Sequence, residues 1–544
     1  MNQVTRRSFL SGGLGAAAAG ALFMMGCAKD GKDSGNSATP AADVQWDYET
    51  DVLVVGFGGA GASAAINASD AGANVLIIEH APEGQEGGNT SVSGGGSNTN
   101  YARPDNREFM YANFPDVIKH EEIDSVLEEL AGTREWMESH GAKIAETIYG
   151  PAFVFVGGNG YALFQWLKET AINSPGVQVM YSTPGKRLIF DPVTKEVYGV
   201  VAEQNGKLIN IKAKRGVVMA CGGFEADHYK MTAYLPAGFP FFTAGTPYNT
   251  GLGLDMVQEV GAKLRGFGSV EYDCHCCKKG SEEIGVALAH SFQNPNSWCN
   301  AIMVNGKGKR FVNETFGGRY AEGQIQRPLH AKEQIPELAQ EFTQFVQEGM
   351  SAAAGGAGYY VYANLPMYMI CGETRISNGE ALFRAAGKGA GNHWASLRGL
   401  YEWSADNQKE IQKGWIIKAD TIEELAKKIN VPAEALAETV AKYDAACAAG
   451  EGDEFGRKFD LTPIGDGPFY ACELGLGIIN TQGGPERDAA HHVISNNDTI
   501  IPRLYAGGEF GSIYVSNYPG ALNVPEAMAT RVAGTNAAKE TPWC

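Results

Sequence analysis

The stretch that decides the fold is Val52-Leu-Val-Val-Gly-Phe-Gly-Gly-Ala-Gly-Ala-Ser-Ala-Ala65, followed by Val75-Leu-Ile-Ile-Glu79. Its first four residues are apolar, as a strand buried on both faces of a parallel sheet requires. Gly56, Gly58 and Gly61 then form a G-x-G-x-x-G turn before an alanine-rich helix. The first glycine permits the tight turn, the second lets the backbone approach a pyrophosphate, and the third lets the helix pack closely on the strand.

The second predicted strand ends in an acid, Glu79. A carboxylate at the end of the second strand, about 20 residues after the glycines, accepts hydrogen bonds from a ribose. The N-terminus of the intervening helix presents unpaired N–H groups to phosphates. A glycine-rich turn alone is weak evidence, because such turns are common. Here strand, turn, helix, second strand and terminal acid occur in order, and together they predict a β-α-β unit that binds a dinucleotide.

The beginning of the chain predicts export. Thr5-Arg6-Arg7-Ser8-Phe9-Leu10 and the apolar run after it are typical of a twin-arginine signal. Met24-Met25-Gly26-Cys27 resembles a lipoprotein cleavage box, so Cys27 is a candidate for lipidation, with plain signal cleavage as the alternative. We expect residues 1–27 to be the signal, residues 28–44 a flexible linker, and the protein to lie in the periplasm or on the outer face of the cytoplasmic membrane. No other stretch approaches 18 consecutive apolar residues, so no membrane span is expected.

The composition limits the partners. A chain of 544 residues should hold more than one domain. Its formal net charge of −18 argues against nucleic acid and anionic lipid as ligands. No C-x-x-C-H occurs, so no covalently attached c-type haem is expected, and an exported redox enzyme of this kind would take its electrons from another protein.

The ten cysteines do not read as a disulfide framework. Cys274-His-Cys276-Cys277 is a local cluster, which suits metal or cluster ligation more than disulfides, although C-x-C-C is not a standard iron–sulfur spacing. We expect buried or free thiols here and keep an iron–sulfur cluster on Cys274, Cys276 and Cys277 as the alternative.

The rest of the chain alternates between predicted strands and helices, which favours an α/β fold. Amphipathic helices are expected over 120–140 and 162–172, and a pair of helices over 421–448, split at Asn430-Val-Pro432. Buried strands that run into glycines are expected over 217–224 and 504–509. His491 and His492 precede a predicted turn and are expected on the surface.

Ordered landmarks beyond the first unit resemble the fumarate reductase and 3-ketosteroid dehydrogenase superfamily of flavoproteins. They are Gly87-Gly-Asn-Thr90, Ala220-Cys-Gly-Gly-Phe224, Thr250-Gly-Leu-Gly-Leu254, Gly308-Lys-Arg-Phe-Val-Asn-Glu314, Ile500-Ile-Pro-Arg-Leu-Tyr-Ala-Gly-Gly-Glu509 and Arg531-Val-Ala-Gly534. The resemblance covers nearly everything after residue 45. It implies FAD, held by a Rossmann-like domain in two segments, 45–271 and 476–540, and an inserted α+β capping domain, 272–475, that closes over the substrate.

The resemblance also assigns cofactor contacts by position. Gly56, Gly58, Gly61 and Glu79 would bind the ADP half. The residues implied near the flavin and its ribityl chain are Asn89, Thr90, Ser91, Gly508, Glu509 and Gly520. The helix that begins near Pro525 would direct its N-terminus at the flavin N1 and O2 atoms.

Two departures from the fumarate reductase pattern bear on the substrate. Fumarate reductases resemble one another in an Asn-Arg-Leu-Gly-Gly-Asn segment, and here Tyr518 replaces the arginine that grips a carboxylate. Asn480 replaces a carboxylate-binding histidine in the segment Asn480-Thr-Gln-Gly-Gly484. A dicarboxylate without these partners would be desolvated unpaired, which is costly for each charge. A small dicarboxylate is therefore not the expected substrate.

The candidate catalytic residues are Tyr518, Arg319 and Tyr320. Tyr518-Pro-Gly resembles the Tyr-Pro-Gly of ketosteroid enzymes, whose tyrosine polarises a substrate carbonyl, although Leu522 replaces the second glycine of that motif. The alternative for Tyr518 is a packed tyrosine bonded to backbone. Arg319 and Tyr320 follow Glu314 where the family places its proton donor. The spacing is one residue longer, so both remain candidates, with a surface salt bridge as the alternative for Arg319.

These features predict an exported FAD-dependent ene-reductase. It would reduce the C=C bond of an aromatic or steroid-like α,β-unsaturated carbonyl compound with electrons from a membrane cytochrome or another donor. The alternatives are the reverse chemistry, as in a 3-ketosteroid dehydrogenase, and a non-catalytic, flavin-bearing electron-transfer lipoprotein.

Overall fold

The computed structural model describes a large part of the chain after residue 43, all within one unit, Thr39–Cys544. The described residues are 44–98, 107, 111, 118–145, 152–155, 159–234, 241–267, 270–289, 300–314, 364–378, 381–383, 393–450, 452–457, 461–514 and 522–543. The export signal, Cys27, Arg319, Tyr320, Tyr518 and Gly520 lie outside these residues.

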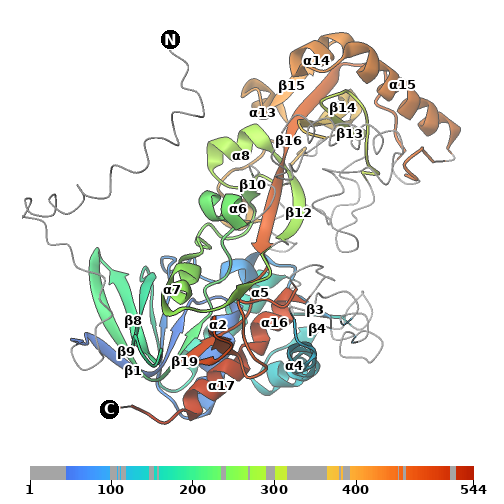
Figure 1. Ribbon diagram of the computed structural model, residues 1–544. Helices are drawn as coiled ribbons and strands as arrows, with labels where there is room; N and C mark the ends of the chain where they lie inside the picture. Colours follow the sequence, from blue (N-terminus) through green and yellow to red (C-terminus); the bar gives the residue numbers. More distant parts are fainter. Residues whose placement is uncertain are drawn as a thin grey trace, which may run out of the picture. The chain divides into compact units, whose positions relative to one another are not determined.

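Parallel strands from distant parts of the chain form the central sheet. β1 (Tyr48–Val55) pairs in parallel with β2 (Val75–Ile78) on one side and with β9 (Lys207–Met219) on the other. β2 continues to β6 (Val177–Met180), and β9 continues to β19 (Ile500–Ala506), again in parallel. Figure 1 shows the blue strand β1, the green strand β9 and the red strand β19 close together in this sheet.

Antiparallel strands complete the sheet of eight, in which the path runs β18-β19-β9-β1-β2-β6. β18 (His492–Ile494) pairs with β19 at the edge. β7 (Gly185–Phe190) and β8 (Val197–Gln204) form a hairpin that joins β9.

The two faces of the central strands are buried in separate cores. Val52 and Val54 face a core shared with α2 (Gly59–Asp70), whereas Leu53 and Val55 face a core shared with α7 (Leu252–Val260). This alternation explains why β1 is apolar at every one of these positions, since successive side chains point to opposite faces. The register Val52↔Val75 and Val54↔Ile77 aligns residues of the first core across β1 and β2.

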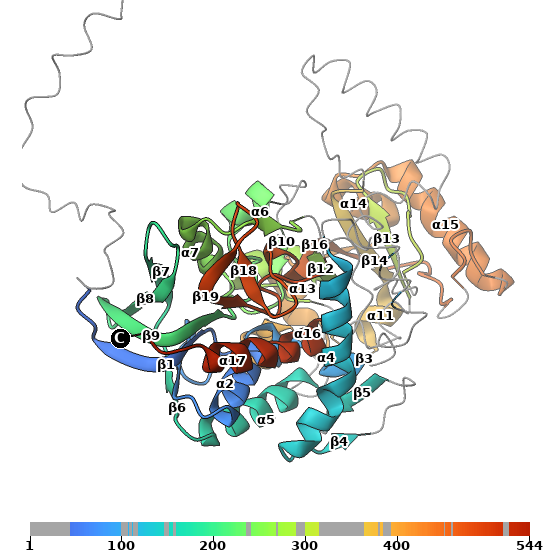
Figure 2. The same cartoon turned by 60° about the horizontal axis from the view of Figure 1, so that its bottom comes forward.

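Four more helices accompany α2. They are α4 (His120–Ser139), α5 (Gly160–Asn173), α16 (Asn523–Ala529) and α17 (Arg531–Lys539). Figure 2 shows α2 and α17 next to each other, with α5 and α4 nearby. The predicted helices over 120–140 and 162–172 are confirmed by α4 and α5.

A second sheet, of six strands, is built around the long strand β16 (Phe469–Thr481). One half of β16 pairs with β14 (Met367–Gly372) and β15 (Ile416–Ala419), and the other half pairs with β12 (Val270–Cys277) and β10 (Phe241–Thr243). β13 (Ala301–Asn305) adds to β14. β16 is the long strand that runs down from this sheet in Figure 1, and its last two residues are Asn480 and Thr481.

The predicted domain boundaries at 271/272 and 475/476 fall inside β12 and β16, and they stay predictions. The predicted helix pair over 421–448 is confirmed by α14 (Ile422–Ile429) and α15 (Ala433–Ala449), which meet at Asn430 in a left-handed conformation.

Short elements make up the remainder. The helical ones are η2 (Gly88–Val92), α6 (His228–Tyr234), α8 (Lys278–Ile284), α11 (Glu373–Ser377), α12 (Trp394–Leu397) and α13 (Gln408–Gln412). The strands are β3 (Gly96–Asn98), β4 (Ile144–Ala145) and β5 (Ala152–Phe155), which form one sheet, and the pair β11 (Leu264–Arg265) and β17 (Gly484–Pro485). No helix within the described ranges is long and apolar enough to cross a membrane.

Candidate active site

A large pocket in the described part of the chain opens at the carboxyl ends of β1, β2 and β9. It encloses about 1140 Å³, including its open mouth. Its walls come from the turns after these three strands, from the segment 246–253, from the end of β16, and from residues 507, 509 and 523–527. Ligands of open α/β sheets bind at this edge, outside the carboxyl ends of the strands.

The glycine turn after β1 forms one wall. Gly56 has a φ of +106°, and a Cβ added there would lie 2.3 Å from the Ala220 carbonyl oxygen. A Cβ at Gly61 would lie 1.9 Å from the Gly56 carbonyl oxygen, so only glycine lets α2 approach β1 so closely. Gly58 has its nearest neighbour at 3.7 Å, so its missing side chain leaves space in the pocket wall. This is the cradle that a pyrophosphate needs.

Glu79 lies beside the glycine turn, at the end of β2. Its Oε2 accepts a hydrogen bond from the Phe57 N–H at 2.5 Å, and its Oε1 accepts one from the Ala81 N–H at 2.7 Å. Burial raises the pKa of this carboxyl to about 7, against the backbone hydrogen bonds, which lower it. A ribose would add the hydroxyl donors that favour the charged form.

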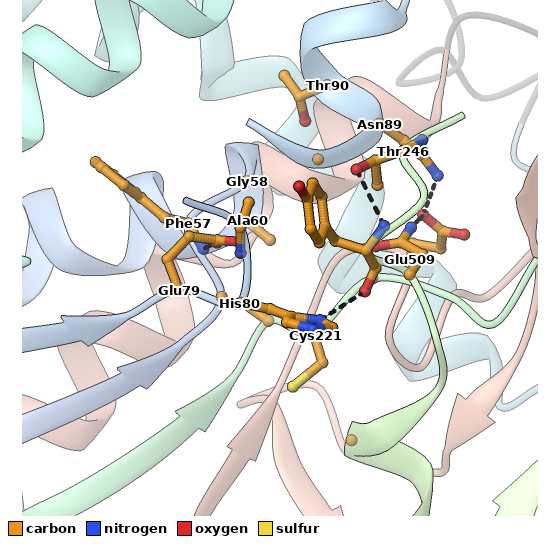
Figure 3. Close-up of a pocket in the computed structure, with 18 of the residues that line it drawn as sticks. Phe57, Gly58, Ala60, Glu79, His80, Asn89, Thr90, Cys221, Thr246 and Glu509 are labelled. Atoms are coloured by element: carbon orange, nitrogen blue, oxygen red, sulfur yellow. Dashed lines mark hydrogen bonds between the residues drawn. The ribbon is translucent and has the colours of Figure 1, made fainter. Parts of the chain in front are cut away.

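Asn89 stands on the opposite side of the pocket (Figure 3). Its Nδ2 donates to Glu225 Oε1 at 2.7 Å and to Glu509 Oε2 at 2.9 Å, while its Oδ1 accepts from the Thr246 N–H at 2.9 Å. Every hydrogen-bonding group of the Asn89 amide is thus engaged, which fixes the orientation of this side chain.

The other predicted cofactor residues differ in their relation to the pocket. Thr90 lines it and accepts a hydrogen bond from the Gly59 N–H at 3.1 Å. Ser91 is buried and donates to the Gly88 carbonyl at 2.9 Å, outside the lining. Gly61 and Gly508 also lie outside the lining. Gly508 has a φ of +69°, and a Cβ there would come within 2.8 Å of the Ala60 Cβ.

Amide side chains meet where β16 approaches α16. Asn523 Nδ2 donates to Asn480 Oδ1 at 3.2 Å, and Gln482 Nε2 donates to Asn523 Oδ1 at 3.2 Å. Asn480 and Asn523 both line the pocket. Asn480 stands where the fumarate reductase pattern has a carboxylate-binding histidine. Its neutral amide belongs to a row of hydrogen-bonded neutral amides.

A buried ion pair anchors α16. Arg487 Nη2 donates to Glu526 Oε1 at 2.5 Å, and Glu526 Oε2 accepts from Ser512 Oγ at 3.0 Å. His491 packs against Arg487 and is only 1 % exposed, so the expectation of a surface position for His491 is wrong. Burial and the charge of Arg487 lower the pKa of His491 well below its usual value. A buried histidine was not foreseen, because its contact with the Ala506 carbonyl arises only when β18 and β19 pair.

Sequence reasoning also missed residues of the pocket. Tyr248, Asn249, His80 and Cys221 line it, and Glu225 stands directly behind Asn89. The only signal for Glu225 was its place just after a buried strand and two glycines, whereas Glu79 directly follows its strand. His80 was adjacent to that recognised acid. Tyr248, Asn249 and Cys221 carried no comparable signal.

Glu314, which precedes the candidate proton donors, is held by buried charges. Arg310 Nη2 donates to Glu314 Oε2 at 2.6 Å, and Arg457 Nη1 donates to the same oxygen at 3.2 Å. Arg319 and Tyr320 follow within six residues but lie outside the described residues, as does Tyr518. Their catalytic roles stay predictions.

The cysteines of the second sheet are free thiols where they are described. Cys276, Cys277, Cys371 and Cys472 are all buried in or beside this sheet. Burial raises the pKa of Cys276 and of Cys371 to about 12, so these thiols are protonated. The side chain of Cys274 is not among those that the structure describes. Among the described residues, no group of three or more His, Cys, Asp or Glu side chains could hold a metal ion.

Comparison with known proteins identifies the family. A family model described as an FAD binding domain matches residues 51–523. The chain belongs to this FAD-binding family. FAD is its cofactor, and the described cradle fits that group: glycine without a side chain at 58, a buried carboxylate at 79 and a fixed amide at 89 all face one cavity. The fold is a mixed α/β FAD-binding fold, and the protein is an FAD-dependent oxidoreductase of a family that acts on C=C or CH–CH bonds.

Three relatives illustrate the range of the family. Fumarate reductase (cytochrome) of Shewanella frigidimarina is 26 % identical over 90 % of this chain and 77 % of that protein. Digoxin reductase of Eggerthella lenta is 26 % identical over 99 % of this chain and 97 % of that protein. Vinyl phenol reductase of Lactiplantibacillus plantarum is 24 % identical over 90 % of this chain and 97 % of that protein. The chain spans about half the length, 51 %, of a further relative, NADH:acrylate oxidoreductase of Vibrio harveyi.

Two solved structures share the fold. 3-Ketosteroid-Δ4-(5α)-dehydrogenase from Rhodococcus jostii RHA1 superposes with a TM-score of 0.59 at 25 % identity, covering 92 % of this chain and 99 % of that one. 3-Ketosteroid Δ1-dehydrogenase from Sterolibacterium denitrificans gives a TM-score of 0.66 at 20 % identity, covering 90 % and 98 %. The second likeness concerns the fold alone.

Proposed function

We propose that this protein is an exported, FAD-dependent ene-reductase for α,β-unsaturated carbonyl compounds that are aromatic or steroid-like. The observation that carries the proposal is the neutral chain Gln482–Asn523–Asn480, which occupies the place of a carboxylate-binding histidine. Among the described residues that line the pocket there is no lysine and no arginine. Arg487, buried nearby, already pairs with Glu526 at 2.5 Å.

A site without a lysine or arginine among its described lining residues selects against a dicarboxylate. Each carboxylate that leaves water without a cationic partner loses its hydration with nothing to replace it. A ketone or phenol needs only one or two neutral hydrogen bonds, which an amide or a tyrosine hydroxyl supplies. The names of two relatives of nearly full length, digoxin reductase and vinyl phenol reductase, support reduction of a large or aromatic substrate.

The residues of the protein would have separate roles in the reaction and in cofactor binding. When bound and reduced by an electron donor, FAD would supply the hydride for the β-carbon of the substrate. Tyr518 would donate a hydrogen bond to the substrate carbonyl, and Arg319 or Tyr320 would give a proton to the α-carbon. Asn89, clamped by Glu225 and Glu509, would hold its amide toward the cofactor. Gly56, Gly58, Gly61 and Glu79 would bind the ADP half.

Architecture and location belong to the same proposal. The central sheet and its helices would form the FAD-binding domain in two segments, 45–271 and 476–540, and the sheet around β16 would belong to a cap, 272–475, that closes over the substrate. Residues 1–27 would direct export by the twin-arginine route, with Cys27 as a possible lipid anchor. Electrons would come from a membrane cytochrome, which the name of the Shewanella relative supports.

The test is anaerobic turnover of the purified, FAD-loaded protein with reduced methyl viologen. The panel holds a steroid enone, a cinnamate, a vinyl phenol and fumarate. We expect reduction of at least one aromatic or steroid compound and negligible reduction of fumarate. Fast reduction of fumarate and of nothing else would contradict the substrate argument.

The second candidate is dehydrogenation of a 3-ketosteroid, favoured by the likeness to the Rhodococcus structure at 25 % identity. It is separated by measuring oxidation of a saturated 3-ketosteroid with an artificial acceptor under matched driving force. A flavin that no compound of either panel reoxidises would instead favour the electron-transfer lipoprotein.

A further inference from the structure

Two glutamates lie against each other at the wall of the pocket. Glu509 lines the pocket, and Glu225 is buried behind it with 4 % exposure. Asn89 Nδ2 donates to both carboxylates, at 2.7 Å to Glu225 and 2.9 Å to Glu509. Asn249 Nδ2 repeats this pattern at 2.8 Å and 3.4 Å. Two amides therefore clamp two carboxylates together.

The other oxygen of each carboxylate, Glu509 Oε1 and Glu225 Oε2, lies beside Gly223. A Cβ added to Gly223 would lie 2.2 Å from Glu509 Oε1 and 2.7 Å from Glu225 Oε2, so only a glycine leaves room between them. Glu509 Oε1 accepts the Thr481 N–H at 3.0 Å. Glu225 Oε2 is buried and accepts no hydrogen bond from the described residues.

No cation balances this pair in the described part of the chain. Neither carboxylate forms an ion pair there, and the elements around them contribute Asn89, Asn249 and Thr481, which are neutral. The charged residues that follow Glu225 are engaged elsewhere, because Lys230 pairs with Asp227 at 3.3 Å and with Asp255 at 3.0 Å. Cys221, the other titratable group on this segment, is protonated because burial raises the pKa of its thiol to about 12.

Two uncompensated carboxylates in contact cannot both stay charged, because desolvation and mutual repulsion each favour the protonated form. Burial raises the pKa of Glu225 to about 7, and burial together with the charge of Glu225 raises that of Glu509 well above its usual value. The pair therefore holds one proton and one negative charge once the pH lies above the Glu225 pKa of about 7.

We propose that Glu225 and Glu509 share one proton while the bound FAD is oxidised and take a second proton from solvent when FAD is reduced, so that Glu225 couples electron uptake to proton uptake. The two electrons and their usual proton go to the cofactor. The extra proton leaves a hydronium ion or a buffer acid, whose bond to that proton breaks, and it forms an O–H bond on the remaining carboxylate. The driving force is the negative charge gained by the cofactor, which raises the proton affinity of the neighbouring pair. Glu225 is thus a positioning residue that acts through Asn89 and Glu509.

The test is the pH dependence of the FAD midpoint potential, measured without substrate on the FAD-loaded protein with a reference dye. Its slope counts the protons taken up for two electrons. Above about pH 7 we expect up to one more proton in the wild type than in Glu225→Gln, which keeps the shape of the side chain but cannot titrate. Equal slopes in the two proteins would overturn the proposal, even if the variant binds FAD more weakly.

The control is Glu410→Gln. Glu410 is equally buried but accepts hydrogen bonds from the Tyr401 hydroxyl at 2.7 Å and the Ser404 N–H at 3.0 Å, outside the pocket lining. Its slope should equal that of the wild type, and a slope changed as in Glu225→Gln would show that the effect is not specific to the pair.

A second measurement covers a Glu225→Gln protein that fails to retain FAD. The infrared difference spectrum of the wild type, reduced minus oxidised, should gain a band of protonated carboxyl that shifts with 13C-labelled glutamate and in D2O. Absence of such a band would overturn the proposal. Because no substrate is present, these results are independent of whether the protein reduces C=C bonds.

Discussion

At the scale of single residues, Glu79 links pH to cofactor binding. Its folded pKa of about 7 lies above the ordinary value of 4.5, so between these two values the folded protein without FAD keeps a proton that the unfolded chain releases. The stability from this proton is complete below 4.5 and is lost as pH rises through 7. FAD binding requires the opposite, charged form. We expect FAD affinity to rise roughly tenfold from pH 6 to pH 8, as a pKa near 7 implies.

Glu79→Gln checks this expectation. Its FAD affinity, measured by fluorescence quenching, should be weaker at pH 8 and nearly independent of pH. Burial lowers the pKa of the neighbouring His80 below its ordinary value, which favours its neutral form. A wild-type affinity that falls with rising pH would contradict the role assigned to Glu79.

The catalytic residues offer a second prediction at this scale. Tyr518→Phe should lower kcat/KM while FAD stays bound, because it removes one hydrogen-bond donor and leaves the ring. Arg319→Met and Tyr320→Phe should differ, with a loss of roughly 10²–10⁴-fold for the variant that lacks the proton donor. Steady-state rates with reduced viologen measure all three. An unchanged kcat/KM of Tyr518→Phe, together with good turnover of fumarate, would refute the proposed carbonyl contact.

At the scale of elements, the contact between β1 and α2 separates two functions of glycine. Gly61→Ala places a Cβ 1.9 Å from the Gly56 carbonyl oxygen, so helix and strand must move apart. We expect a destabilisation of roughly 1–3 kcal/mol or more, typical of overpacking. Gly58→Ala has space for its Cβ, so the fold should persist while FAD affinity falls. Thermal unfolding and FAD titration of both variants distinguish the two effects, and equal losses of stability would contradict this division.

The anchor of α16 gives a further prediction. Arg487 and Glu526 are 2 % and 1 % exposed, so Glu526→Gln leaves a buried arginine without its counter-charge. Breaking such a pair costs roughly 3–5 kcal/mol. Glu138→Gln removes an exposed partner of Arg134 on α4 and should change the unfolding midpoint little. If both variants unfold alike, the buried pair does not stabilise the fold as argued.

Elements could be predicted where the signal is local. The β-α-β unit, α4, α5, α14 and α15 follow from hydrophobic periodicity and from Gly and Pro at their ends, which short segments encode. The extent of β16 does not, because its thirteen residues are ordered by four partner strands from distant segments. Glu79, by contrast, was recognisable from its place at the end of the β-α-β unit. The roles of Glu225 and His491 depend on neighbours brought together only by folding.

At the scale of the whole molecule, the prediction concerns the donor of the electrons that reduce FAD. The sequence contains one G-x-G-x-x-G unit in the expected β-α-β context and no c-type haem motif. The chain spans only about half of an NADH-dependent relative, so that relative's use of NADH does not transfer to it. We therefore expect the purified protein to turn over with reduced methyl viologen and at least roughly tenfold more slowly with NADH at equal concentration, since NADH requires a binding site that positions its hydride. Anaerobic stopped-flow reduction of the bound FAD by each donor measures this directly. Rapid, saturable reduction by NADH would contradict the prediction and would locate a nicotinamide site on this chain, whereas rapid reduction by viologen alone leaves a protein carrier as the donor.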